Sequence, residues 1–274
     1  MHYGMILPGG SAVEQLDQAI LAEESGWDGV FVWEAAYGVD AWALLAAIAV
    51  RTTRITIGTL LTPLPWRRPW KVASQAATVD QLSGGRVVLT VGIGAITDDL
   101  PLTGEVTDLK QRAERLDEGV DLIRVLWEGG KSYRGRFYEY EAGELDELTT
   151  MGGPLRSQIP IWVVAVWPRP KSMNRALRCE GVVPQYEGLG YDAQPEHARA
   201  VRDWLDGRGG SGIDLVAQGE TPADDPENAR ALVAGWADVG CTWWLETRWE
   251  MPHGTEERMR QVRERLASGP PRPV

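Results

Sequence analysis

Glu34 is the residue whose type and position point most directly to catalysis. It ends the apolar run GVFVWE, so its carboxylate is expected at the end of a strand. Partial burial or a charged neighbour would tune it there as a proton donor or acceptor. A salt bridge to a loop arginine such as Arg67 is the structural alternative. Either way, the carboxylate belongs to the end of a strand rather than to the core.

Two glycines in the run VGIGA, Gly92 and Gly94, form a second candidate feature. They would let the backbone approach a planar ring or a phosphate closely, because glycine has no Cβ. A tight turn explains them equally well. Ala95 ends this run, and Asp98 and Asp99 follow in a long loop. These aspartates could orient a substrate, although adjacent acidic residues in loops are usually solvated.

Tryptophan is unusually frequent, with 13 residues against 2 phenylalanines. Most of these side chains are expected to fill the layer between strands and helices. Trp33, Trp66 and Trp167 are the exceptions that we expect in an apolar cavity, because each lies at or after the end of a predicted strand.

Short apolar runs alternate with helical stretches about eight times along the 274 residues, which predicts a parallel sheet. The expected strands are residues 3–7, 29–34, 55–61, 87–91, 159–166, 181–186, 213–218 and 242–246. The expected helices are residues 11–25, 40–51, 109–127, 169–179, 195–206, 225–239 and 256–266, with one more that follows the loop 63–69 and ends near residue 82. Ser11 and Glu14 are expected to form a capping box on the first helix.

Eight such units predict a single (β/α)8 TIM barrel over residues 1–268, followed by a loose tail, residues 269–274. Residues 133–141 alternate aromatic and polar side chains, which predicts a small hairpin inserted between the fourth helix and the fifth strand. A doubly wound open sheet has the same periodicity. However, LPGGSAVEQ lacks the GxGxxG turn of nucleotide-binding open sheets, and the number of units favours the barrel.

Binding groups of such barrels lie at the carboxyl ends of the strands. This rule selects, besides Glu34, the following positions: residues 59–62, residues 92–99, Val166, Trp167, residues 185–187, Glu220 and residues 246–248. A glycosidase would need two facing carboxylates, and nothing in the spacing of Glu187 and Glu220 indicates such a pair.

The composition excludes several functions. A net charge of -11 argues against binding to nucleic acid, because that affinity comes mostly from Lys and Arg. About 18 consecutive apolar residues occur nowhere, so we expect a cytoplasmic protein that does not span a membrane. Cys179 and Cys241 are far apart and have no metal or redox spacing, so buried reduced thiols and no metal site are expected.

Five segments resemble successive blocks of the luciferase-like family of oxidoreductases, in the same order. They are AEESGWDGVFVWE (residues 22–34), the long block from residue 44 to residue 94, RLDEGVDLIRVLWEG (115–129), YRGRFY (133–138) and IPIWV (159–163). The resemblance implies a barrel that binds FMN or the deazaflavin coenzyme F-420 at its carboxyl mouth. It also implies a homodimer that acts on a small-molecule substrate. A flavin reductase is a candidate partner.

The sequence departs from the family pattern at two positions that bear on residue roles. The family often has an Asp-His pair after the second strand, where this chain has Glu34 and Ala35, so the imidazole is missing. A Gly-rich turn often receives the cofactor phosphate after the fifth strand, where this chain reads AVWPRP. Trp167 in this turn would crowd a phosphate, whereas Arg169 could bind one directly.

Other positions keep the family pattern. The end of the third strand in this family commonly carries a bulge with a non-proline cis peptide beneath the ring. The resemblance therefore implies that Thr59, Leu60 and Leu61 contact the ring, with Gly92, Gly94 and Ala95 beside it. Val166, Trp167 and Arg169 complete the expected cofactor site, and Trp33, Trp66, Asp98 and Gln185 the expected substrate site.

Three functions follow as hypotheses. The leading one is a flavin-dependent monooxygenase that uses reduced FMN and oxygen on a small organic substrate, with Glu34 assisting proton transfer. The alternative is an F-420-dependent dehydrogenase or reductase that transfers hydride. The third, motivated by the missing histidine and the altered turn, is a non-catalytic subunit that binds flavin or a partner.

Overall fold

Eight parallel strands form a closed barrel in the computed structural model, which describes residues 1–95, 103–144, 153–156, 158–247 and 256–272. The barrel strands are β1 (His2–Ile6), β2 (Gly29–Val32), β3 (Thr56–Thr59), β5 (Val87–Gly92), β8 (Ile161–Trp167), β9 (Gly181–Tyr186), β10 (Asp214–Gly219) and β11 (Trp243–Glu246). Parallel pairing of β1 with β11 and of β3 with β5 closes the ring. The predicted (β/α)8 barrel is confirmed, and the open sheet is excluded.

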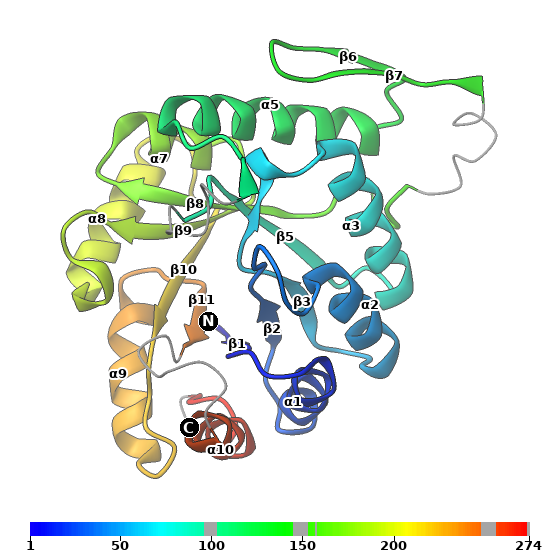
Figure 1. Cartoon of the computed structure of the whole chain (residues 1–274). Helices are drawn as coiled ribbons and strands as arrows, with labels where there is room; N and C mark the ends of the chain where they lie inside the picture. The colour runs from blue at the N-terminus through cyan, green and yellow to red at the C-terminus, as the bar shows by residue number, and fades with distance from the viewer. Residues whose placement is uncertain (96–102, 145–152, 157, 248–255, 273–274) are drawn as a thin grey trace.

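Helices surround the barrel on its outer face (Figure 1). They are α1 (Ala12–Glu24), α2 (Ala41–Arg51), α3 (Pro69–Ser83), α5 (Leu109–Trp127), α7 (Pro170–Ala176), α8 (Pro195–Asp206), α9 (Pro226–Asp238) and α10 (Glu256–Ala267), with 3-10 turns η1 (Leu64–Trp66) and η2 (Gly190–Asp192). The Ser11 side chain accepts from the backbone N–H of Glu14, and Glu14 accepts from that of Ser11 at 2.8 Å, which confirms the capping box. In the described part of the chain, no helix is long and apolar enough to cross a bilayer.

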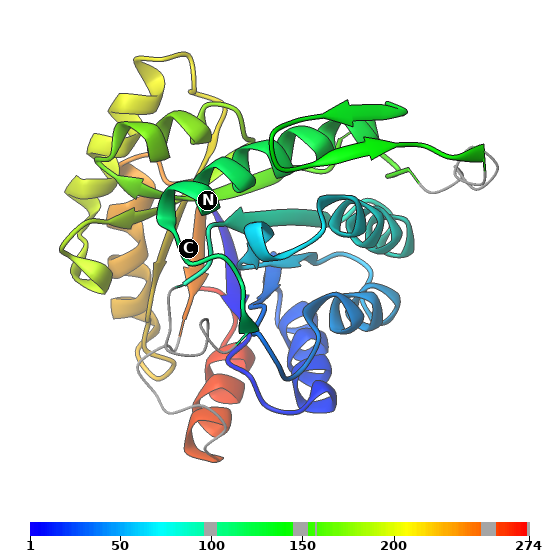
Figure 2. The same cartoon turned by 45° about the horizontal axis from the view of Figure 1, so that its top comes forward.

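Two short segments stand apart from the repeating units. Strands β6 (Ser132–Arg134) and β7 (Glu139–Glu141) pair antiparallel as the predicted hairpin, which projects from the body of the barrel (Figure 2). Strand β4 (Thr62–Pro63) continues the line of β3 after an interruption at Leu60 and Leu61, and it pairs with β5. The interruption lies where β3 reaches the carboxyl end of the barrel.

Aromatic rings fill the inside of the barrel. The rings of Phe31 and Trp162 stack with centroids 5.4 Å apart, and Trp243 meets Trp162 at 5.3 Å. Gly181 makes room for this packing, because a Cβ at that position would lie 2.2 Å from a ring carbon of Trp162. These rings close the interior, so a binding site has to lie above them at the carboxyl ends of the strands.

Arg86, which follows the SGG turn, ties the ends of two helices to the start of β3. Its guanidinium donates to the carbonyls of Ala49 (2.8 Å), Thr52 (2.9 Å) and Ile55 (2.6 Å), and to that of Ser83 at 2.7 Å. These carbonyls lie at the ends of α2 and α3 and in the loop after α2. The planar fork therefore satisfies backbone acceptors that helix ends leave open.

We expect Arg86→Lys to lower the free energy of unfolding by about 2–4 kcal/mol, because an ammonium group cannot replace this fork of hydrogen bonds. Urea unfolding followed by circular dichroism measures the change. Arg51→Lys, at an exposed position at the end of α2, is the matched control and should change stability by less than about 0.5 kcal/mol. Equal losses for the two variants would contradict the role given to Arg86.

Candidate functional site

A cavity of about 570 Å³ opens at the carboxyl ends of the strands. We call it the larger cavity. Its size is within the usual range for small-molecule and cofactor sites. Its described lining consists of Leu60, Leu61, Ile93, Gly94, Ala95, Leu109, Ala113, Val164, Val166, Arg169, Lys171, Ser172, Arg175, Val183, Gln185 and Gln218.

The interrupted end of β3 forms part of the apolar wall of the larger cavity. Leu60 and Leu61 are joined by a cis peptide bond, as the family pattern implied. Gly92 lies behind Leu61, because a Cβ on Gly92 would lie 2.6 Å from a methyl carbon of Leu61. Thr59 is fully buried, and its hydroxyl donates to the carbonyl of Thr90 at 3.1 Å. Neither Thr59 nor Gly92 therefore lines the cavity; both support the leucines that do.

Basic side chains line the larger cavity where β8 leads into α7. Arg169 donates to Glu187 from its Nε at 3.1 Å, and Arg175 makes two hydrogen bonds to Asp117, at 2.7 and 2.9 Å. Lys171 lines the same region and makes no ion pair with any residue the structure describes. We call this region, at the start of α7, the cationic end of the cavity; Leu60, Leu61 and Ile93 provide an apolar surface elsewhere in the lining.

A smaller cavity of about 380 Å³ lies beside the end of β2, on the other side of the chain that follows β3. Leu60 and Leu61 line the larger cavity, whereas Pro63 and Trp66 line the smaller one. The described lining of the smaller cavity is Glu34, Ala35, Ala36, Tyr37, Gly38, Val39, Asp40, Ala41, Pro63, Trp66, Arg67, Thr103 and Glu105.

Glu34 is held in the smaller cavity by one of its two carboxylate oxygens. Its Oε1 accepts a hydrogen bond from Nη1 of Arg67, whose Nη2 donates to Gln75 at 2.7 Å. The Glu34 side chain is only 9% exposed, and its Oε2 is buried with no hydrogen-bond partner among the described residues. Burial lowers the pKa of Arg67, although an arginine stays protonated. The salt bridge named as the structural alternative exists, and it leaves one carboxylate oxygen available.

Trp66 lies at the boundary where the two cavities adjoin. Its indole lines the smaller cavity and lies over Gly94, where a Cβ would be 2.2 Å from a ring carbon. Its Nε1 donates to the carbonyl of Val106 at 3.2 Å. Arg112 lies on the ring with its Cζ 5.4 Å from the centroid, and donates to the carbonyls of Ile93 and Gly94 at 3.1 Å each. Gly94, Trp66 and Arg112 therefore form one packed wall.

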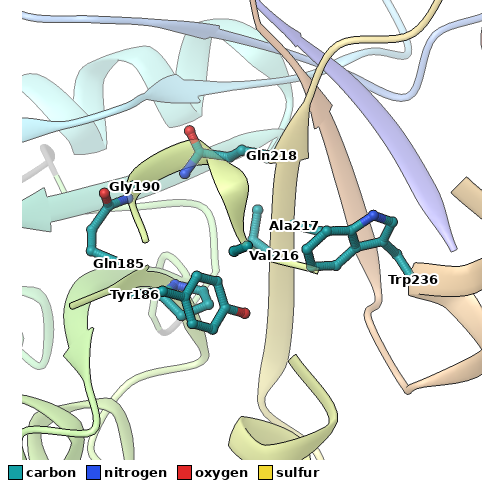
Figure 3. Close-up of a pocket in the computed structure, with 9 residues that line it drawn as sticks. Gln185, Tyr186, Gly190, Val216, Ala217, Gln218 and Trp236 are labelled. Carbon is teal, nitrogen blue, oxygen red and sulfur yellow. The ribbon is translucent and has the colours of Figure 1, made fainter. Parts of the chain in front are cut away.

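A third space, between β9, β10 and α9, is too small for a substrate. Figure 3 shows Tyr186, Ala217 and Trp236 among its lining residues. Its volume of about 20 Å³ accommodates about one water molecule. The Tyr186 hydroxyl is buried and has no hydrogen-bond partner in the described part of the chain, and burial raises the pKa of Tyr186. A space of this size has room for water but not for a substrate.

The larger cavity brings together many of the side chains expected to hold the cofactor. Leu60, Leu61, Gly94, Ala95, Val166 and Arg169 line it, as does Gln185, which was expected to contact substrate. Glu34 and Trp66 line the smaller cavity. Trp167 lines neither, because it points to the helix layer and meets the ring of Trp204 edge-on at 6.3 Å. Trp33 lies near Gly9 and lines neither, and Asp98 is outside the described residues.

Several lining residues were not anticipated from the sequence. Lys171 and Ser172 lie in the first turn of α7, and Gln218 lies near the end of β10. The rule of carboxyl strand ends would have found Gln218, since residue 218 ends the predicted strand. Arg112 gave no signal, because a basic residue early in a helix is ordinarily exposed, whereas this one is fully buried.

The cysteines take no part in either cavity. Both are free and buried, as expected. Burial raises the pKa of Cys179 to about 11 and that of Cys241 to about 12, so both thiols are protonated at neutral pH. Within the described ranges, no three His, Cys, Asp or Glu side chains are grouped to hold a metal ion.

Comparison with known proteins places this architecture in a family. A family model described as luciferase-like monooxygenase matches residues 2–271. The chain belongs to this family. The resemblance inferred from the sequence blocks is therefore confirmed, and the departures at Glu34, Ala35 and Trp167 are those of one family member.

The proteins that are similar to this luciferase-like family member include F420-dependent enzymes. It is 38% identical to an F420-dependent glucose-6-phosphate dehydrogenase of Amycolatopsis mediterranei over 45% of this chain and 40% of that protein. An enzyme of the same name from Beutenbergia cavernae is 27% identical over 90% of this chain and 82% of that protein. The first alignment thus spans less than half of the relative's length. Both relatives are oxidoreductases.

A solved structure with the same fold is an F420-dependent secondary alcohol dehydrogenase in complex with an F420-acetone adduct. It superposes with a TM-score of 0.73 and 17% sequence identity, and covers 97% of each chain. At this identity the likeness concerns the fold. It shows that the whole barrel is shared, including the region of β9, where the sequence signal for a strand was weakest.

Proposed function

We propose that this family member is an F420-dependent oxidoreductase that transfers hydride between the deazaflavin and an alcohol or its carbonyl product. The observation that carries this proposal is the pair of adjoining cavities: one with an apolar surface and a cationic end, the other with a buried carboxylate oxygen to which none of the described residues donates. The F420-dependent relatives support it. They favour the second hypothesis drawn from the sequence over the leading one, the monooxygenase.

The larger cavity fits a flat heteroaromatic ring with a phosphate-bearing tail. Leu60, Leu61 and Ile93 offer an apolar surface to a ring, and Gly94 and Ala95 leave space beside it. Arg169 and Lys171, at the cationic end, would pair with a phosphate. The side-chain amides of Gln185 and Gln218 provide donors and acceptors for the polar edge of a ring. These residues would orient the cofactor and exclude water from it.

When bound, the deazaflavin would accept or give a hydride at its ring. Glu34 supplies what an alcohol needs as it loses a hydride, namely an acceptor for the hydroxyl proton. Its Oε2 is the free acceptor, while Arg67 fixes the other oxygen and hence the orientation of the carboxylate. In the reverse direction, the protonated carboxyl would return the proton to a carbonyl oxygen. No histidine is required for this exchange.

The second candidate is the monooxygenase that uses reduced FMN and oxygen, and the family description favours it. The same larger cavity would hold FMN, since both cofactors combine a tricyclic ring with a phosphate. A non-catalytic flavin-binding subunit is the third. A homodimer, a flavin reductase as partner and a cytoplasmic location remain predictions from the sequence.

Equilibrium titration with oxidised F420 and, separately, with FMN tests the assignment of the cofactor. We expect F420 to bind at least about tenfold more tightly, which corresponds to about 1.4 kcal/mol. Lys171→Ala, which removes the unpaired cation, should weaken binding of F420, whereas Lys110→Ala, in the first turn of α5, serves as the control. Tighter binding of FMN would support the monooxygenase instead, and binding of neither would refute both assignments.

A further inference from the structure

We infer that the smaller cavity selects alcohols that carry no phosphate or carboxylate group, so that sugar phosphates are poor substrates. This inference rests on the proposed function, because it concerns the compound that would exchange hydride with the cofactor. It differs from what the names of the relatives state, which is activity on glucose 6-phosphate. Two independent observations carry it, namely the free oxygen of Glu34 and the charges around it.

The free oxygen of Glu34 requires a hydrogen-bond donor from the ligand. An ionised carboxylate only accepts hydrogen bonds, and none of the described residues donates to Oε2. The side chain is 9% exposed, so water compensates poorly for the missing partner. A hydroxyl group donates one hydrogen bond and satisfies this oxygen. A phosphate dianion cannot satisfy it. A phosphate ester that donated to Oε2 through one of its hydroxyl groups would bring its dianion among like charges.

The charges of the described lining are predominantly negative. Glu34, Asp40 and Glu105 are acidic, and Arg67 is the basic residue among them. Arg67 is already paired with Glu34 and donates to Gln75, so its charge and hydrogen bonds are engaged. Asp40 and Glu105 therefore leave the cavity with an excess of negative charge. Such a lining raises the free energy of a bound anion and leaves that of a neutral alcohol nearly unchanged.

The larger cavity has the opposite character. Arg169 and Arg175 line it in ion pairs with Glu187 and Asp117. Lys171 lines it without an ion pair among the described residues, so an anion is favoured there and disfavoured in the smaller cavity. The two cavities thus divide the ligands by charge. The phosphate-bearing cofactor matches the cationic end of the larger cavity, and an uncharged hydroxyl compound matches the smaller one.

The experiment compares matched pairs of probes on the protein saturated with F420: glucose with glucose 6-phosphate, and glycerol with glycerol 3-phosphate. Two quantities are measured for each probe. One is the dissociation constant from the change in fluorescence of the bound deazaflavin, and the other is kcat/KM for its reduction. We expect the neutral member of a pair to bind at least about tenfold more tightly and to have the higher kcat/KM.

Charge-neutral variants test whether Asp40 and Glu105 cause this preference. Asp40→Asn keeps the side-chain oxygen that caps α2 by accepting from Ala43 at 2.8 Å, and Glu105→Gln keeps the shape of an exposed side chain. The double variant should lower the ratio of the two dissociation constants at least about threefold. Glu227→Gln, in the first turn of α9 and away from this cavity, removes one charge and should leave the ratio unchanged.

Each outcome decides the inference. Tighter binding of the phosphate esters, or binding of neither member of a pair, overturns it while the proposed function stands, provided that F420 binds and is reduced by some other alcohol. A ratio that the double variant does not change overturns the role of the two acidic residues. Failure of F420 to bind at all is seen first, in the cofactor titration, and overturns the proposed function itself.

Discussion

Glu34→Gln is expected to slow reduction of the bound deazaflavin by an alcohol by about a hundredfold or more. The amide keeps the size of the side chain and can still accept from Arg67, but it cannot take the hydroxyl proton. The barrier should therefore rise by about 2.7 kcal/mol or more. Stopped-flow absorbance under anaerobic conditions measures this rate. The dissociation constant of the cofactor should change little, because Glu34 lines the other cavity.

Arg67→Gln is the control that separates catalysis from the salt bridge. If Glu34 served only to pair with Arg67, both variants would lose stability and their activities would follow the folded fraction. We expect instead that Arg67→Gln, which disturbs the orientation of the carboxylate but keeps it, slows the reaction less than Glu34→Gln does at equal folded fraction. Glu34→Asp, which restores a carboxylate on a shorter chain, should recover part of the rate. A Glu34→Gln protein with an unchanged rate would refute the catalytic role.

Gly94→Ala is expected to raise the dissociation constant of the cofactor at least about tenfold, which is about 1.4 kcal/mol. Gly94 has a φ of +80°, and a Cβ there would lie 2.2, 2.4 and 2.8 Å from three carbons of the Trp66 ring. The indole cannot move freely, because Nε1 is bonded to Val106 and Arg112 lies on the ring. The methyl group therefore forces the wall between the cavities to shift.

Gly104→Ala is the control that distinguishes the effect of this steric clash from the effect of backbone strain. Gly104 also has a positive φ, +72°, but a Cβ there would meet nothing within 4 Å. Both variants should lose about 1–2 kcal/mol of stability from the left-handed conformation. Only Gly94→Ala should lose more stability than this, and only this variant should also bind the cofactor more weakly. Isothermal titration and urea unfolding of the two variants measure the difference, and identical behaviour would contradict the wall assigned to Trp66.

The order of strands and helices could be predicted from the sequence for a physical reason. Strands of a parallel barrel are buried on both faces, so they appear as short apolar runs, and the helices between them begin and end at recognisable caps. Segments 109–127 and 195–206 were predicted with the bounds that α5 and α8 have. The sequence of β9, GVVPQY, indicated a strand more weakly because it contains a proline and polar residues. The strand nevertheless spans the predicted residues.

The site could be predicted only in part, because the face on which a side chain lies depends on single-residue alternation. In β8, Val164 and Val166 point to the larger cavity, whereas Trp167, one residue later, packs on Trp204. Gly92 precedes Gly94 by two residues, but Leu61 fills the space in front of it. Such packing depends on the interruption after β3, whose course does not follow from composition or period.

Ion pairs between residues far apart in the sequence could likewise be predicted only in part. The ion pair of Glu34 with Arg67 was foreseen as an alternative, since both lie near strand ends, and it is present. That it occupies only one oxygen of the carboxylate depends on three-dimensional packing. The free Oε2 is nevertheless the atom on which the proposed proton transfer and the choice of substrate depend.

Hydride transfer between an alcohol and F420, without oxygen, is the reaction that we propose for this chain. The most direct measurement mixes the protein with oxidised F420 and a neutral secondary alcohol in the absence of oxygen, and follows the deazaflavin absorbance together with the carbonyl product. We predict loss of the oxidised absorbance with one carbonyl formed per F420 reduced. No reduction of F420 by any alcohol, combined with oxygen-dependent turnover of a substrate by the protein with reduced FMN, would contradict this proposal.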